Sequence, residues 1–164
     1  MNKPNLLILE DDPMQQKLYK VICDRFSFNC RICSGCDEVL NLLEQDGVGF
    51  DICLLDWALQ DESGLECIKK IRDVNKTNHR RGLPIIMVTA HAMTGDREIC
   101  IRAGANDYLS KPFTLEAFHS LVMHWVQESR QGFWMQDSAQ MFDSHGRLQR
   151  HPHESGQPQE SPRS

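Results

Sequence analysis

Three carboxylate side chains follow two short apolar runs of the sequence. Glu10 and Asp11 come directly after the run 6–9, and Asp56 comes directly after the run 52–55. Clustered carboxylates repel one another unless a cation neutralises them. Mg²⁺ prefers oxygen ligands and keeps several of its waters, so carboxylate oxygens, a backbone carbonyl and waters suit it. These residues therefore predict a magnesium site, provided that the fold brings them together.

Asp56, Lys111 and Thr89 supply the groups that phosphoryl transfer requires. A lone aspartate at the end of a buried strand suits a carboxylate nucleophile aimed at phosphorus. Lys111 can place a positive charge against the transferred oxygens, and the Thr89 hydroxyl can donate a hydrogen bond to one of them. Together with Mg²⁺ this set provides positioning and charge neutralisation, which are the main needs of the reaction.

The elements that must position these groups alternate along residues 1–130. Apolar runs predict strands at 6–9, 28–33, 52–56, 85–89 and 107–110, and amphipathic stretches predict helices at 14–25, 36–46, 64–75, 95–103 and 114–130. Strands that are apolar throughout are typical of a parallel sheet covered by helices on both sides. Ligands of such sheets bind beyond the carboxyl ends of the strands, so we expect the candidate residues to meet at that edge.

Two helix ends carry clear local signals. Asp12 and Pro13 form a favourable pair of N-cap and first-turn residue for the first helix, and Gly104 is suited to cap the fourth helix at its carboxyl end.

Five motifs together resemble the receiver domain of two-component response regulators. They are Leu6-Leu-Ile-Leu-Glu-Asp-Asp12, Asp51-Ile-Cys-Leu-Leu-Asp56, Gly64, Pro84-Ile-Ile-Met-Val-Thr-Ala90 and Gly104-Ala-Asn-Asp-Tyr-Leu-Ser-Lys-Pro-Phe113. The similarity covers residues 5–128, and the stretch 89–97 is most similar to receivers of hybrid sensor kinases and phosphorelays. The resemblance implies a flavodoxin-like (βα)5 fold, a doubly wound five-stranded parallel sheet with strand order 2-1-3-4-5.

The resemblance also implies roles for individual residues. Asp56 would be the phosphoacceptor and Asp11 a direct Mg²⁺ ligand. Glu10 would contribute to the metal site through water, and the backbone carbonyl of Ala58 would complete the protein ligands. Lys111 would neutralise charge on the phosphoryl group.

A switch and a control of phosphoryl lifetime follow from the same resemblance. The Thr89 hydroxyl would move toward the phosphoryl group and the Tyr108 ring would rotate inward, repacking the face formed by the fourth helix, fifth strand and fifth helix. Ala58 and His91 occupy positions that border the path of attacking water; Ala58 is too small to orient that water, whereas His91 can. The family often has proline at the position of Gln60, which lacks a fixed φ, so we expect a looser loop there.

The implied partners are proteins. A sensor histidine kinase or a histidine phosphotransfer protein would donate the phosphoryl group, and a downstream protein or a second copy of the chain would bind the switch face. Two alternatives stay open: a pseudo-receiver that binds partners without phosphorylation, and an aspartate-nucleophile phosphatase of the haloacid-dehalogenase type. The phosphatase needs Asp-x-Asp after the first strand, where this chain has Glu10-Asp11-Asp12. We therefore expect a phosphoacceptor signalling domain and not an enzyme with turnover.

Composition limits the classes of partner. The chain has 164 residues and a net charge of −5 from 18 basic and 23 acidic residues, which argues against nucleic-acid binding through a basic surface. No apolar run approaches the roughly 18–20 residues that span a bilayer, and the amino-terminal residues lack the apolar core of a signal peptide. We expect a cytoplasmic protein, and the remaining residues leave no room for a DNA-binding or catalytic output domain.

The composition changes near residue 130. We predict a receiver domain at 1–130 and a polar, disordered tail at 131–164. Apolar residues seven positions apart offer an alternative for part of the tail, a short amphipathic helix at 133–145.

The seven cysteines are predicted to be free thiols that pack as small apolar groups. A metal site beginning at Cys30-x-x-Cys33-x-x-Cys36 is the alternative. It is disfavoured because Cys30 and Cys33 fall in a predicted strand.

Overall fold

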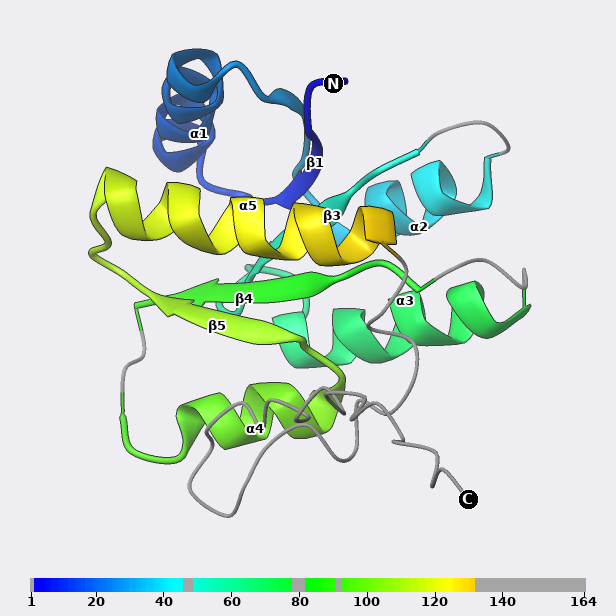
Figure 1. The fold of residues 1–164 in the computed structure, drawn as a ribbon. Helices are drawn as coiled ribbons and strands as arrows, with labels where there is room; N and C mark the ends of the chain where they lie inside the picture. The colour runs from blue at the N-terminus through cyan, green and yellow to red at the C-terminus, as the bar shows by residue number, and fades with distance from the viewer. Residues whose placement is uncertain (1, 46–48, 78–81, 91–92, 132–164) are drawn as a thin grey trace, which may run out of the picture.

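The structure, a computed structural model, describes residues 2–45, 49–77, 82–90 and 93–131 (Figure 1). Its strands are β1 (Asn5–Leu9), β2 (Asn29–Cys33), β3 (Ile52–Asp56), β4 (Ile85–Thr89) and β5 (Asp107–Ser110). Its helices are α1 (Pro13–Phe26), α2 (Cys36–Glu44), α3 (Gly64–Thr77), α4 (Asp96–Ala103) and α5 (Leu115–Gln131). The predicted tail 131–164, apart from Gln131, and its alternative helix 133–145 lie outside the described residues.

All strands pair in parallel in the order β2-β1-β3-β4-β5, which confirms the predicted fold and strand order. Helices α1 and α5 cover one face of the sheet, and α2, α3 and α4 cover the other (Figure 1). Because every strand runs in the same direction, the carboxyl ends of β1, β3, β4 and β5 gather at one edge, which we call the carboxyl edge.

The central strands are buried along their whole apolar length. In β3 and β4 every residue is buried, whereas the edge strand β2 alternates between more and less exposed positions. Fully burying an aliphatic side chain stabilises a fold by roughly 1.5–3 kcal/mol. The continuous apolar runs therefore place β1, β3 and β4 in the middle of the sheet, where their last residues are held rigidly.

Capping at two helix ends follows the predictions. Oδ1 of Asp12 accepts hydrogen bonds from the backbone N–H of Met14 at 2.7 Å and of Gln15 at 3.4 Å, which fixes the start of α1. Gly104 ends α4 with a φ of 114°, a left-handed conformation that favours glycine. Asp12 is thus used locally, while its neighbours Glu10 and Asp11 remain available to the carboxyl edge.

Arg72 joins three segments beneath the start of β5. Its guanidinium group donates to the carbonyl oxygens of Gly104 and Leu83 and to Oδ1 of Asn106, at 2.6 to 3.0 Å. The same Asn106 oxygen accepts from the backbone N–H of Ile85 at 2.8 Å. Burial lowers the pKa of Arg72 to about 10. These bonds fix β5 against α3 and β4, and so fix the strand that leads to Lys111.

The prediction that all cysteines are free thiols is wrong for one pair. Cys36 and Cys67 form a disulfide with Cα atoms 5.8 Å apart and a sequence separation of 31. Sequence spacing did not reveal the pair because α2 and α3 come together only when both pack on the same face of the sheet. The other five cysteines are free and are buried or half-buried, as predicted for small apolar groups.

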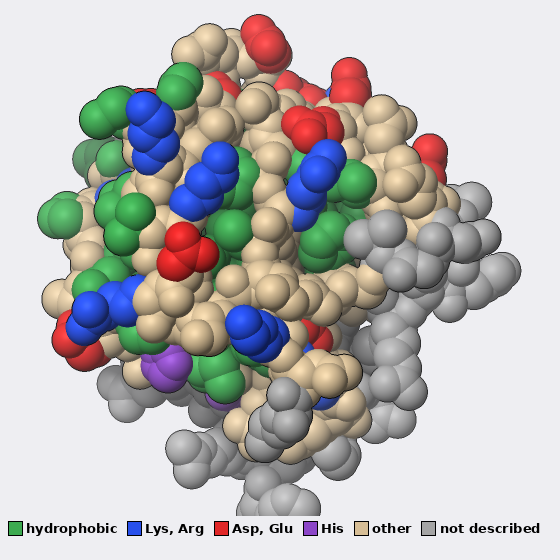
Figure 2. All heavy atoms as spheres, turned by 90° about the horizontal axis from the view of Figure 1, so that it is seen from above, with side chains coloured by type: hydrophobic (Ala, Val, Ile, Leu, Met, Phe, Trp, Pro, Cys, Tyr) green, Lys and Arg blue, Asp and Glu red, His purple; other side chains and the backbone are tan. Residues whose placement is uncertain are grey.

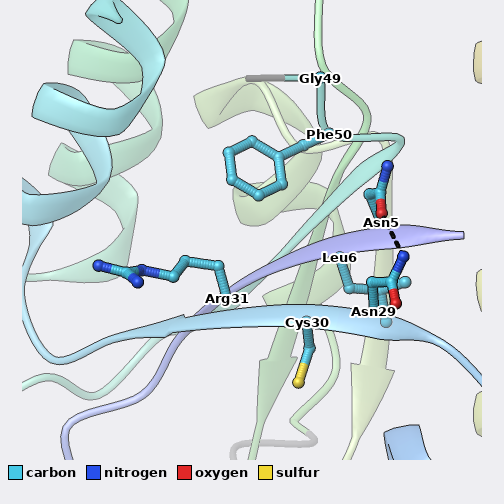
Figure 3. Close-up of a pocket in the computed structure, with 7 residues that line it drawn as sticks. All are labelled: Asn5, Leu6, Asn29, Cys30, Arg31, Gly49 and Phe50. Atoms are coloured by element: carbon cyan, nitrogen blue, oxygen red, sulfur yellow. Dashed lines mark hydrogen bonds between the residues drawn. The ribbon is translucent and has the colours of Figure 1, made fainter. Parts of the chain in front are cut away.

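A shallow hollow of about 350 Å³ lies at the edge of the sheet opposite the carboxyl edge. Figure 3 shows Asn5 and Asn29 at the start of β1 and β2, joined by a hydrogen bond of 2.9 Å, with Arg31 and Phe50 nearby. Because β1 begins at this end and Glu10 follows its other end, the hollow is separate from the candidate site. None of the helices in the described ranges is both long and apolar enough to cross a membrane.

Candidate functional site

The fold brings three of the predicted site residues into direct contact at the carboxyl edge. Glu10 follows β1, Asp56 ends β3 and Lys111 follows β5. Nζ of Lys111 lies 3.2 Å from Oδ2 of Asp56 and 3.4 Å from Oε2 of Glu10. Both carboxylates are buried, with 7% and 1% of the residue exposed for Asp56 and Glu10. The charges are therefore shielded from water, which strengthens their interaction.

Lys111 has a third partner, which the sequence analysis missed. Its ammonium group also contacts Oε1 of Gln15, in the first turn of α1. The next residue, Gln16, donates from Nε2 to the carbonyl oxygen of Glu10 at 2.6 Å. The first turn of α1 therefore forms one wall of the site. The sequence could have indicated this wall, because a helix that starts near residue 14 places the side chains of Gln15 and Gln16 beside the end of β1.

Asp56 is held by the loop that follows it. Its Oδ1 accepts a hydrogen bond of 3.0 Å from the backbone N–H of Ala58. The loop closes when the N–H of Gly64 donates to the carbonyl oxygen of Trp57 at 2.9 Å. A Cβ atom on Gly64 would lie 2.3 Å from the carbonyl oxygen of Asp56, so only glycine lets α3 begin this close to the strand end.

Asp11 is oriented by the same loop. Its Oδ2 accepts a hydrogen bond of 2.6 Å from the backbone N–H of Gln60. Proline has no N–H and cannot make this bond. The looser loop expected at Gln60 stays a prediction, but the same residue gives the loop a hydrogen bond to Asp11 that proline could not make.

Glu10 has an unusual affinity for protons. Burial raises the pKa of Glu10 to about 7, and the neighbouring Asp56 carboxylate acts in the same direction. The hydrogen bond of 3.0 Å from the N–H of Asp12 and the charge of Lys111 oppose this effect. At the carboxyl edge the two carboxyl groups of Glu10 and Asp56 share one ammonium group, that of Lys111, a setting that suits a further cation.

The donor set fits Mg²⁺. This ion takes one or two protein carboxylates and completes its octahedral shell with waters and phosphate oxygens. Within the described ranges no group of three or more His, Cys, Asp or Glu side chains is close enough to hold a metal ion. A magnesium ion here would take at most two of the three carboxylates directly. Asp56 precedes the loop that carries Ala58, and Asp11 accepts a hydrogen bond from Gln60 in the same loop.

The predicted switch residues lie on neighbouring paired strands. Thr89 ends β4, is fully buried and pairs with Ser110, while Tyr108 pairs with Met87 two positions earlier. The Tyr108 ring is half-buried against the face covered by α2, α3 and α4. Burial raises its pKa, with a smaller effect from Asp96 of α4. The structure thus places Thr89 at the carboxyl edge and Tyr108 beside α4, and His91 lies outside the described residues.

Helix α1 exposes apolar side chains next to this site. Met14, Leu18 and Val21 are 72%, 53% and 64% exposed, and their spacing puts them on one side of the helix. Figure 2 shows hydrophobic side chains at the surface among Lys and Arg side chains on the face that includes α1. The exposed residues Lys17 and Lys20 belong to the same helix.

Comparison with known proteins places this chain in a family. The model of the family described as "Response regulator receiver domain" matches residues 6–123. The hybrid signal transduction histidine kinase I of Dictyostelium discoideum is 31% identical over 132 residues, which are 76% of this chain and 8% of the relative. This chain thus spans only a small part of that relative's length.

Two solved structures are similar in fold. One is the receiver domain of a sensor histidine kinase from Pseudomonas aeruginosa with magnesium coordinated in its active-site cleft, at 26% identity and a TM-score of 0.63, covering 77% of this chain and 99% of that one. The other is a Saccharomyces cerevisiae co-crystal of the histidine phosphotransfer protein Ypd1 with the receiver domain of Ssk1. It has 26% identity and a TM-score of 0.70, covering 83% and 96%.

Proposed function

We propose, because this chain belongs to the response regulator receiver domain family, that Asp56 accepts a phosphoryl group from a phosphohistidine. The donor is a sensor histidine kinase or a histidine phosphotransfer protein. The observation that carries the proposal is the contact of 3.2 Å between Oδ2 of Asp56 and Nζ of Lys111 at the carboxyl edge. The chain acts as a signalling phosphoacceptor, with slow loss of its own phosphoryl group and without turnover of a substrate.

In the transfer, a carboxylate oxygen of Asp56 forms a bond to phosphorus while the bond from phosphorus to the donor's histidine nitrogen breaks. The protonated donor imidazole keeps that bonding pair and leaves as a neutral ring. The Ala58 N–H holds one carboxylate oxygen in place. The Lys111 ammonium group stabilises the negative charge on the transferred oxygens. The buried Thr89 supplies a hydroxyl donor at the same edge.

Asp11, Asp56 and the backbone carbonyl of Ala58 are the protein ligands proposed for Mg²⁺, with Glu10 contributing through water. The bound ion would neutralise repulsion between the carboxylates and the incoming phosphoryl oxygens. The orientation of Asp11 by the Gln60 N–H supports this assignment. The raised pKa of Glu10 also supports it. A buried carboxylate is unfavourable without a hydrogen-bond partner, and a metal-bound water would be such a partner.

The Thr89 and Tyr108 switch passes the change to the face formed by α4, β5 and α5. Asp107, the first residue of β5, supports this route because it contacts both helices. Its Oδ1 lies 3.5 Å from the Arg97 guanidinium group of α4, and its Oδ2 accepts from Nε1 of Trp125 in α5 at 2.9 Å. A shift of β5 would therefore be felt in both helices, and a downstream protein or a second copy of the chain would bind there.

The donor protein approaches over α1. Its exposed apolar residues lie on the helix whose Gln15 contacts Lys111, so a partner seated on α1 is next to the phosphoacceptor. The lysines Lys17 and Lys20 would meet acidic residues on that partner. The relative crystallised with a phosphotransfer protein supports a partner of this class.

Three further assignments complete the proposal. Ala58 and His91 control the lifetime of the phosphoryl group through the attacking water. The chain functions in the cytoplasm and binds proteins, not nucleic acid or membranes. Residues 1–130 form the receiver domain and 131–164 a polar tail.

The test is the mass of the intact chain after incubation with Mg²⁺ and acetyl phosphate. We expect one added phosphoryl group, which is absent in Asp56→Asn and when EDTA replaces Mg²⁺. The matched control is Asp61→Asn, an exposed aspartate in the same loop, which should be phosphorylated like the wild type. Failure of the wild-type chain to gain mass would support the phosphorylation-independent binding module instead.

A further inference from the structure

We propose that Cys36 and Cys67 form a reversible redox site that controls how readily Asp56 is phosphorylated. The proposal rests on the proposed function, because its main effect is on the same phosphoacceptor. Nothing in the receiver chemistry described above uses a cysteine, and the two sulfur atoms join elements that are far apart in the sequence.

The disulfide lies close to the carboxyl edge. Cys36 is the first residue of α2, which begins soon after the carboxyl end of β2, and Cys67 is in the first turn of α3. The two helices pack beside one another on the same face of the sheet (Figure 1). The bond therefore joins the ends of α2 and α3 that are nearest to the phosphoryl site.

Short contacts connect Cys67 to Asp56. The N–H of Cys67 donates to the carbonyl oxygen of Ser63 at 3.2 Å, and Ser63 pairs with Ala58 in an isolated antiparallel bridge. Ala58 in turn holds Oδ1 of Asp56 at 3.0 Å. When the disulfide is closed, the first turn of α3 and the loop 57–63 are anchored to α2. When it is open, they keep only their non-covalent contacts.

The remaining thiols on this face do not compete for the disulfide. Cys33, Cys53 and Cys100 belong to the same core layer and are buried. Burial raises the pKa of Cys33 and Cys53 to about 12 and that of Cys100 to about 11. Thiol–disulfide exchange requires a thiolate, and the raised pKa of these three thiols lowers the fraction of each that is a thiolate. On this face of the sheet, the disulfide in the structure therefore involves only Cys36 and Cys67 among the described cysteines.

Cys36 is the more exposed residue of the pair, so we assign it the first step of the exchange. It is 5% exposed, whereas Cys67 is fully buried. In the reaction that closes the disulfide, the oxidant is a small disulfide such as oxidised glutathione. Cys36 as a thiolate forms a mixed disulfide and releases one glutathione thiol, and Cys67 then displaces the second. The two protein thiols lose two electrons and two protons, and one glutathione disulfide becomes two thiols.

In the proposed cytoplasmic setting, the disulfide would open and close in response to redox conditions. In reducing compartments disulfides are mostly transient and are used in catalysis or redox sensing. The reduced chain would be the resting form, and oxidation would prepare the loop 57–63 for phosphorylation. The closed form holds Ala58, and through it Asp56, in the geometry seen here, which removes an ordering step from the reaction.

The experiment compares the full chain after treatment with oxidised glutathione and after treatment with dithiothreitol. Alkylation under denaturing conditions should count five free thiols in the oxidised chain and seven in the reduced chain. With Mg²⁺ and acetyl phosphate, the oxidised chain should gain its phosphoryl group at least about fivefold faster, a typical size for coupling between two sites. Seven thiols after oxidation, or equal rates in chains with five and seven thiols, would overturn the proposal.

Variants assign the effect to the pair. Cys36→Ser and Cys67→Ala should both show the slow rate of the reduced chain under either treatment. Cys100→Ala, which removes a free thiol from the same core layer, should keep the full redox dependence. A redox dependence that survives Cys36→Ser would assign it to another cysteine and would contradict the proposal.

A second readout separates this proposal from the proposed function. Hydrogen exchange of residues 57–67 should be slower in the oxidised chain than in the reduced chain, whether or not Asp56 is phosphorylated. If neither form gains a phosphoryl group but exchange still differs, the phosphoacceptor role fails and the redox coupling to the loop stands. If exchange is the same in both forms, the redox coupling is wrong.

Discussion

Lys111 and Arg72 are two cations enclosed by the same fold, but their surroundings differ. Lys111, whose side chain is 19% exposed, contacts two carboxylates and one amide oxygen. Among the described residues, Arg72 donates to neutral oxygens of the backbone and of one asparagine. One cation is shared by two carboxyl groups, and the other is surrounded by fixed dipoles.

The difference separates a reactive edge from a structural joint. Around Lys111 two carboxyl groups share one ammonium group, so the site can bind another cation and change when a phosphoryl group arrives. Around Arg72 the acceptors are carbonyl groups whose positions depend on the fold, so these bonds hold β5 against its neighbours. A planar guanidinium group with several donors suits the second task, and a compact ammonium group suits the first.

The largest expected effect is on the reactive edge. Lys111→Met should lower the rate of Asp56 phosphorylation by about 100- to 1000-fold, because one preorganised charge that stabilises the transferred oxygens is lost. The rate is measured from the intact mass of the chain over time with acetyl phosphate and Mg²⁺. The matched control is Lys70→Met, whose ammonium group pairs with Glu62 at the surface. A Lys111→Met rate within tenfold of wild type would contradict the reactive role assigned to Lys111.

The next effect should appear at the structural joint. Arg72→Met removes the guanidinium donor from the carbonyl oxygens of Gly104 and Leu83, while the Asn106 oxygen keeps the N–H of Ile85. We expect the free energy of unfolding to fall by about 3 kcal/mol. Urea denaturation followed by circular dichroism measures this change. Arg31→Met, at a side chain that is 61% exposed, should alter stability far less. The folded Arg72→Met chain should still be phosphorylated, and a loss of phosphorylation without a loss of stability would show that the two regions are not separate.

A smaller effect concerns Glu10 and pH. Its pKa is about 7 in the folded chain against 4.5 for an unperturbed glutamate, because the side chain is buried. Between these values the folded chain binds more protons than the unfolded chain, so stability should decrease as pH rises through this interval. In metal-free buffer we expect a decrease of about 2 kcal/mol between pH 4.5 and 7.5 that is attributable to this residue.

Glu10→Gln isolates that contribution, because glutamine keeps the shape of the side chain and does not titrate. The difference in free energy of unfolding between the wild type and Glu10→Gln should grow in favour of the variant as pH increases. A difference that does not vary with pH would mean that Lys111 fully neutralises Glu10, and the reactive edge would then resemble the structural joint.

The smallest effect is expected at Gln60. Gln60→Pro removes the N–H that binds Asp11, and the free energy of unfolding should fall by about 1 kcal/mol relative to Gln60→Ala, which keeps the N–H. Denaturation of the two variants in parallel measures the backbone bond without the side chain. Equal stability of the two variants would indicate that solvent replaces this bond without loss.

The fold and the charged centre of the site could be predicted from sequence for a common physical reason. Apolar runs of strand length that alternate with amphipathic helices leave few arrangements other than a parallel sheet, and the polar residues after each run must then meet at one edge. Glu10, Asp56 and Lys111 meet there as predicted. Asp12 was also predictable, because capping depends only on residues close in sequence.

The remaining contacts depend on how separate elements dock. The contact of Gln15 with Lys111 spans 96 residues of sequence, and a glutamine near a helix start gives no hint of it. The pairing of Cys36 with Cys67 depends on the packing of α2 against α3, which spacing along the chain does not encode. In the sequence Gln60 differs from the family pattern only by lacking a proline ring, but its backbone N–H binds Asp11, a bond that proline would remove.

Gly64 has no reactive side chain, yet its replacement should affect phosphorylation as strongly as the replacement of a reactive residue. A Cβ there would meet the carbonyl oxygen of Asp56 at 2.3 Å and the Leu55 side chain at 2.7 Å, whereas a Cβ on Gly35 would meet nothing within 4 Å. In a library of all single substitutions scored by phosphorylation, every replacement of Gly64 should therefore score as low as a lost nucleophile, while Gly35 should accept most residues. A map of mutational tolerance would outline the space that Asp56 needs as well as the groups that act on phosphorus.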